Sequence, residues 1–88
     1  MTTTVAPTAT VTFDANNGTG PTTIQTANVS TVLTSNSFNR TGYTFTGWNT
    51  VSGGGIGGTP DLDGASYAFT ASVTLYAQWV LTDHTEVP

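Results

Sequence analysis

The 88-residue chain contains no cysteine and a single basic residue, Arg40, so lysine is absent as well. Without cysteine there is neither a disulfide framework nor a thiolate metal site. Without lysine there is no Schiff-base or P-loop chemistry, and no lysine–asparagine isopeptide cross-link. We therefore expect the mechanical strength of the fold to come from non-covalent interactions, unless a threonine–glutamine ester forms at Gln25 or Gln78.

Charge is also scarce, because only 7% of the residues are charged and the formal net charge is -4. One cation cannot neutralise a row of phosphates, which excludes nucleic acid and anionic membrane surfaces as partners. No stretch approaches 18 consecutive apolar residues, so we expect no membrane insertion. The start, "MTTTVAPTAT", lacks the basic and apolar regions of a signal peptide, and we expect the chain to be part of a larger protein.

Threonine takes the place of charge and makes up about a quarter of the chain. Its β-branched side chain suits a pleated, half-exposed surface better than a helix. With 36% hydrophobic residues, four Phe, three Tyr and two Trp, the composition indicates a folded domain. The composition therefore predicts a mainly β fold.

Composition also divides the chain into three parts. We predict a Thr/Pro linker at 1–8, one folded domain at 9–81, and a tail or linker at 82–88. One domain of this size has a single core.

Periodicity of two predicts the strands inside this domain. Apolar and polar residues alternate at 11–15, and an Asn-Asn-Gly turn follows. Residues 22–33 predict a strand that becomes irregular, with one or two helical turns allowed within 29–38. In "TGYTFTGW", alternation places Tyr43 and Phe45 on one face and Trp48 on the other.

The second half of the domain continues this pattern. Residues 51–64 contain many glycines and a proline, which predicts a long exposed loop without regular structure. A short strand is predicted at 66–69, and a long strand is predicted at 72–81. The expected total is about five strands with at most one short helix.

Three segments, in this order, resemble one known family, the Listeria-Bacteroides repeat, which is the B-repeat of internalin-type surface proteins. They are "VTFDANNGTG" at 11–20, "RTGYTFTGWNT" at 40–50 and "YAFTASVTLYAQW" at 67–79. The resemblance implies a ubiquitin-like β-grasp fold, which is α+β by family, and tandem copies in bacterial surface or secreted proteins. In such a fold the first and last strands are parallel neighbours at the centre of the sheet.

The family signature maps onto structural rather than catalytic residues of this chain. Its main positions are Phe13, Arg40, Gly42, Tyr43, Phe45, Gly47, Trp48, Leu75, Ala77 and Trp79, with Asp14, Asn16, Gly18, Tyr67 and Tyr76 completing it. Two departures are Asn17, where the family often has glycine, and the glycine-rich loop at 51–64. Asn is the residue other than glycine that best tolerates positive φ, so the first departure affects the turn type.

The exposed or buried state of the aromatic residues decides between two functions. Exposed rings stack on sugars, whereas buried rings fill a small core. We assign Trp48 and Trp79 to the core, because a domain this small has few other large side chains. Tyr76 points opposite to its neighbours Leu75 and Ala77 and is our candidate for a surface contact.

The remaining polar residues do not predict a chemical site. Asp61 and Asp63 occupy two positions of a calcium-loop spacing, but two carboxylates make a poor calcium site, and we interpret them as an Asp-rich turn. Arg40 is expected to make a structural contact. No nucleophile, base and oxyanion arrangement is recognisable, so we predict no enzymatic activity, no metal and no cofactor.

Two functional hypotheses remain. The first is a non-catalytic, monomeric spacer or stalk module, associated with adhesion, in an extracellular protein that is secreted or on the bacterial surface; its partners are neighbouring repeat domains of the same chain. The second is an adhesion module that binds a host glycan or protein through Tyr76, the loop at 51–64 or a sheet edge.

Overall fold

A computed structural model describes residues 7–53 and 57–82 of the chain. This part contains seven strands and no helix, and thus no helix long and apolar enough to cross a membrane. The strands are β1 Ala9–Asp14, β2 Thr23–Ala27, β3 Thr31–Val32, β4 Tyr43–Asn49, β5 Pro60–Asp61, β6 Ser66–Tyr67 and β7 Val73–Leu81. The mainly β prediction is confirmed, and the strands beyond the five expected, β3 and β5, have two residues each.

Parts of the predicted linker, loop and tail lie outside the described residues. These are 1–6, 54–56 and 83–88, the last of which includes the only histidine.

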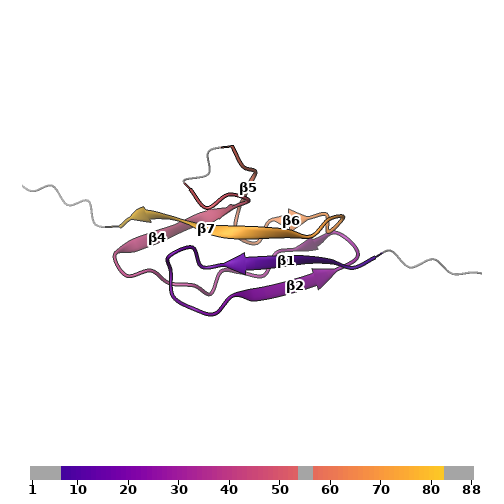
Figure 1. Ribbon diagram of the computed structural model, residues 1–88, viewed down its shortest axis with the longest axis horizontal. Coiled ribbons are helices and arrows are strands. Elements are labelled where there is room, and N and C mark those ends of the chain that lie inside the picture. The colour runs from indigo at the N-terminus through magenta and orange to yellow at the C-terminus, as the bar shows by residue number, and fades with distance from the viewer. Residues whose placement is uncertain (1–6, 54–56, 83–88) are drawn as a thin grey trace, which may run out of the picture.

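Five strands form one sheet in the order β2-β1-β7-β4-β5, and β3 pairs with β6 in a separate two-stranded ladder. Within the sheet, β1 and β7 are parallel, with Val11 opposite Val73 and Phe13 opposite Leu75. This confirms the predicted pairing of the first and last strands. As a result, β1 begins at one end of the sheet and β7 ends at the other (Figure 1).

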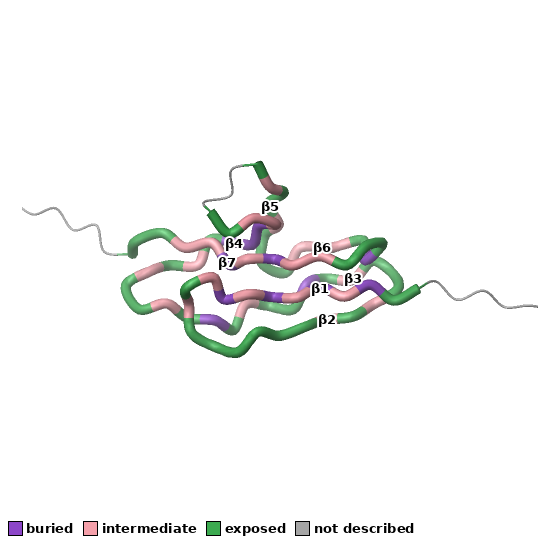
Figure 2. Tube along the Cα trace, in the orientation of Figure 1, coloured by how far each residue is buried: buried purple, intermediate pink, exposed green. Residues whose placement is uncertain are grey.

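Alternation in β1 and β7 builds the centre of the core, as predicted. β1 buries Ala9, Val11 and Phe13, and β7 buries Leu75 and Ala77. Figure 2 shows buried positions along these two strands and on β4, whereas most of β2 is exposed. The core is therefore concentrated at the middle of the sheet.

The segment between β2 and β4 supplies the second layer, with Leu33 and Phe38 as its buried side chains. It contains β3 but none of the helical turns allowed by the sequence. Gln25 of β2 fixes the segment, because its side-chain amide donates to the Val32 carbonyl and accepts from the Thr34 N–H, at 2.9 and 2.7 Å. These bonds satisfy backbone groups that a helix would otherwise satisfy internally.

Two turns use positive φ angles, and the first of them is the predicted Asn-Asn-Gly turn. Asn16 and Asn17 have φ values of 47° and 77°, and Gly18 donates its N–H to the Ala15 carbonyl at 2.9 Å, as in a type I′ turn. Asparagine tolerates this region because its short polar side chain limits the steric cost. At the start of β4, Gly42 has φ 83°, as the third residue of a type II turn requires.

A bulge in β4 overturns the predicted alternation of "TGYTFTGW". The register with β7 shifts between Phe45 and Gly47, so Thr46 is an extra residue without a partner in the pairing. The shift brings Trp48 to the same side as Phe45, with ring centroids 4.9 Å apart. Gly47 has φ 146°, which its lack of a side chain makes accessible.

The glycine-rich segment 51–64 also differs from the prediction of a loop without regular structure. Pro60 and Asp61 pair with Asn49 and Trp48 and form the edge strand β5. Proline fits here because an edge strand leaves half of its N–H groups without a ladder partner.

Candidate functional site

An aromatic cluster around Trp48 fills the interior. The Trp48 ring is 2% exposed, and its centroid lies 4.8 Å from Phe13, 4.9 Å from Phe45 and 6.0 Å from Phe38. The interplanar angles of 56° to 77° are tilted or edge-to-face arrangements, which the ring quadrupoles favour. Trp48 is therefore enclosed and offers no stacking platform to a ligand.

The two tryptophans differ in their polar atoms. Trp48 Nε1 is buried and has no hydrogen-bond partner among the described residues. Trp79 is half-buried, contacts Phe45 edge-on at 5.7 Å, and donates its Nε1–H to the Ala15 carbonyl at 2.9 Å. Trp79 thus ties β7 to the turn that follows β1, whereas Trp48 contributes packing alone.

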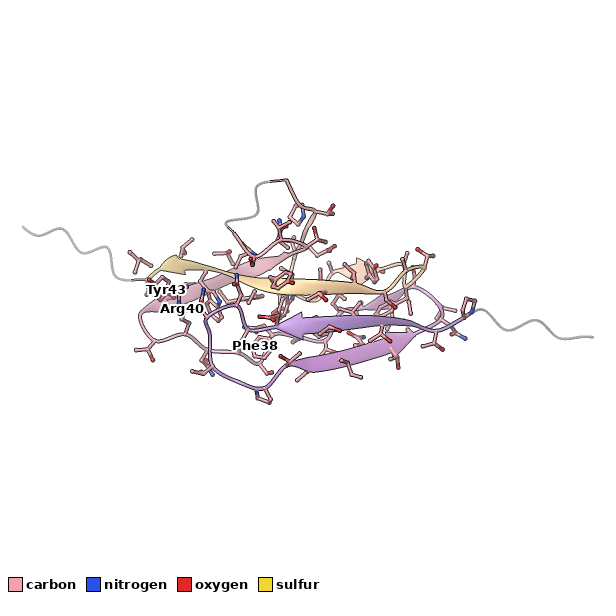
Figure 3. The ribbon with its side chains drawn as sticks, viewed as in Figure 1. Phe38, Arg40 and Tyr43 are labelled. Atoms are coloured by element: carbon pink, nitrogen blue, oxygen red, sulfur yellow. The ribbon has the colours of Figure 1, made fainter. Side chains whose placement is uncertain are left out.

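Arg40 and Tyr43 form a separate pair at the start of β4 (Figure 3). The guanidinium carbon lies 3.6 Å from the centre of the Tyr43 ring, a cation–π contact. The backbone connects the same two residues, since Tyr43 N–H donates to the Arg40 carbonyl at 2.9 Å. The chain's single basic side chain therefore braces a turn.

Tyr76 lies on the sheet face opposite the core. It is half-buried and stands between Asp14 of β1 and Asn49 of β4 in the register. Tyr76 is not among the residues that line the open groove at Gly47.

An open groove of about 600 Å³ crosses β4 at Gly47 and was not identified from the sequence. It is lined by residues 46–49, 60–62 and 78–80. Because β4 lies between β5 and β7, a groove bounded by both strands must pass over β4. A Cβ atom on Gly47 would lie 3.2 Å from the Asp61 carbonyl oxygen, a tight contact with the backbone of β5. The bulge residues Thr46 and Gly47 line the groove, and its one sequence signal is a glycine inside a strand.

Two exposed apolar residues and Asp61 are among the residues that line this groove. Leu62 is 73% exposed and Val80 is 51% exposed. Burial raises the pKa of the Asp61 carboxyl above its ordinary value of 3.8. The neighbouring Asp63 is engaged differently, because its Oδ1 accepts the Asn36 N–H at 2.9 Å. The described residues contain no group of three His, Cys, Asp or Glu side chains that could hold a metal ion.

We expect Asp61→Asn to raise the melting temperature at pH 7 by about 1–3 °C. Because the pKa of the Asp61 carboxyl is higher in the folded state, ionising this carboxyl lowers the stability of the fold. The stability is therefore fully present below pH 3.8, and part of it is lost as the pH rises through the raised pKa. The gain should therefore disappear below pH 3.8, which thermal unfolding followed by circular dichroism at acidic and neutral pH can measure. Asp63→Asn is the control, and an equal gain there would assign the effect to net charge.

These observations define a small, mainly β domain with an aromatic interior. The family model of the Listeria-Bacteroides repeat domain matches residues 10–78, and the chain belongs to this family of bacterial repeat domains. Searches of curated proteins and of solved structures give no significant match.

Proposed function

We propose that this domain is a structural spacer, associated with adhesion, in an extracellular bacterial protein that is secreted or held at the cell surface. Its partners on this proposal are neighbouring repeat domains of the same chain, and it has no catalytic role. The parallel pairing of β1 with β7 carries the proposal. A chain that enters at one end of a sheet and leaves at the other extends a stalk by the length of the domain.

The same pairing determines how tension acts on the fold. Force applied through the two ends pulls β1 and β7 in opposite directions along their shared ladder, which extends from Val11 opposite Val73 to Asp14 opposite Tyr76. All hydrogen bonds of the ladder are then loaded together. β7 is also held on its other side by β4, over the register from Tyr43 to Asn49. Resistance to tension therefore arises without a covalent cross-link.

We further propose that the sheet is a β-grasp in which the irregular segment between β2 and β4 occupies the place of the helix. Two observations support this. The first and last strands are central and parallel, and Leu33 and Phe38 pack on the sheet as a helix face would.

Single-molecule force measurements test the spacer role, and the absence of cysteine allows attachment at introduced cysteines. A shear variant has Thr8→Cys and a cysteine appended after Pro88. A peel variant has Thr8→Cys and Ala71→Cys, which lie just before the neighbouring strands β1 and β7. We expect a markedly higher unfolding force in the shear variant, because its bonds break together rather than singly. Equal forces in both variants would contradict the spacer proposal.

A further inference from the structure

Three asparagines of the chain begin the tripeptide Asn-X-Ser/Thr, in which X is not proline. They are Asn17, Asn28 and Asn39, followed at the third position by Thr19, Ser30 and Thr41. This tripeptide is the acceptor for N-linked glycosylation, because a transferase recognises the asparagine amide together with the hydroxyl two residues later. None of the three asparagines lies inside a strand. The fold therefore determines which of these sites a transferase can reach.

The asparagines of these tripeptides differ from the other asparagines of the chain. All three are exposed, and their side chains make no hydrogen bond with residues 7–53 and 57–82. By contrast, the side chains of Asn16, Asn36 and Asn49 are less exposed, and each one hydrogen-bonds the backbone. An amide that holds the backbone is not available to a sugar. The state of the amide alone therefore allows all three tripeptides and no other asparagine.

The backbone of two tripeptides is held by the fold. Thr19 and Asn39 exchange backbone hydrogen bonds, with N···O distances of 2.6 and 3.3 Å, so the first and third tripeptides are tied to each other. The Thr19 hydroxyl also donates to the Asn39 carbonyl at 3.0 Å. Arg40, the middle residue of the third tripeptide, stacks on Tyr43. A transferase binds either tripeptide only after these contacts open, which lowers the fraction of the chain that it can use.

The tripeptide of Asn28 is free of such contacts. Residues 28–30 are the whole connection between β2 and β3, and all of them are exposed, with Val29 at 64%. Outside the strand ladders, their one hydrogen bond in the described part of the chain joins the Thr31 hydroxyl to the Val29 carbonyl at 2.9 Å. The Ser30 hydroxyl makes no hydrogen bond within that part. Both groups that a transferase recognises are therefore available.

We propose that Asn28 is the N-glycosylation site of the folded domain, and that the fold protects Asn17 and Asn39. A separate glycosyltransferase supplies a hexose activated as its nucleoside diphosphate. The Asn28 Nδ2 atom forms a bond to the anomeric carbon and loses a proton, while the bond from that carbon to the phosphate oxygen breaks and the nucleoside diphosphate leaves with the electron pair. Since Ala27 pairs with Ala9, the sugar stands at the end of the sheet where β1 begins. This site goes beyond the spacer role and does not depend on it.

Transfer of glucose from UDP-glucose by a soluble bacterial N-glycosyltransferase that accepts both Asn-X-Ser and Asn-X-Thr tests the proposal. Mass spectrometry of proteolytic fragments gives the rate at each asparagine. Synthetic peptides of residues 14–22, 25–33 and 36–44 give the rates without the fold, and dividing by them removes the preference of the transferase among the sequences. We expect this folded-to-peptide ratio to be at least about tenfold higher for Asn28 than for Asn17 or Asn39, whose tripeptides must first open.

Substitutions at the third position of the tripeptide separate recognition from exposure. Ser30→Ala removes the hydroxyl, keeps Asn28 in place and should abolish transfer to it. Ser30→Thr keeps a hydroxyl and should retain transfer. Both variants should unfold at the same urea concentration as the original chain, because Ser30 is exposed. The proposal is overturned if Asn28 of the folded chain stays unmodified, if the ratio at Asn17 or Asn39 equals that at Asn28, or if Ser30→Ala is modified as fast as the original chain.

Discussion

Replacing Trp48 with alanine is expected to leave the chain largely unfolded in water at 25 °C. The ring is 2% exposed and contacts Phe13, Phe38 and Phe45. Truncating a buried tryptophan costs about 3–5 kcal/mol, and a single core of this size supplies about the same amount. Far-UV circular dichroism and the dispersion of amide NMR signals measure the loss. A variant with the wild-type urea midpoint would show that Trp48 is not central to the core.

Phenylalanine substitutions at the two tryptophans separate packing from hydrogen bonding. Trp48→Phe removes a buried N–H that has no partner among the described residues, which offsets part of the lost packing, and we expect a cost of about 1 kcal/mol. Trp79→Phe removes the hydrogen bond to the Ala15 carbonyl, and we expect about 1–2 kcal/mol. Urea unfolding of both variants gives the comparison. A larger cost for Trp48→Phe would contradict an unpartnered Nε1.

Simple alternation predicted the strands that form the middle of the sheet. In β1 and β7 one face meets the core and the other does not, so Val11, Phe13, Leu75 and Ala77 recur with a period of two. The Asn-Asn-Gly turn could also be predicted from the sequence, because few residues other than asparagine and glycine tolerate positive φ. The pairing of β1 with β7 is not a local property, and the resemblance to a known family supplied it.

The features that alternation missed depend on contacts between distant segments. Thr46 is an extra residue in β4, and one added residue reverses the face of Trp48, so burial and periodicity gave conflicting predictions for this tryptophan. The predicted strand at 66–69 ends at Tyr67, because Phe69 turns its ring into the core at φ 55°. The groove is lined by residues of the bulge and of β5, which are far apart in the sequence. A sequence period cannot identify such a site.

Gly18→Ala is expected to cost about 3 kcal/mol, because it adds a methyl group where Trp79 and the neighbouring backbone leave no space. Its Cβ would lie 2.6 Å from Trp79 Cζ2 and 2.9 Å from the Asn39 carbonyl oxygen. The carbonyl belongs to a bridge between Thr19 and Asn39, so the backbone cannot retreat without breaking it. Movement of Trp79 instead would break its bond to Ala15. Urea unfolding measures the cost, and loss of the indole N–H shift of Trp79 would identify the second route.

Two other glycines separate this steric effect from backbone conformation. A methyl group on Gly42 would meet no atom within 4 Å, but the residue has φ 83°, so Gly42→Ala should cost about 1–2 kcal/mol through strain alone. Gly53 has neither constraint, and Gly53→Ala should be neutral or stabilise by up to about 1 kcal/mol. The stability costs should decrease in the order Gly18, Gly42, Gly53 if the close contact with Trp79 costs more than backbone strain does. A cost at Gly18 no larger than at Gly42 would mean that the turn yields, and that Trp79 does not fix it to the sheet.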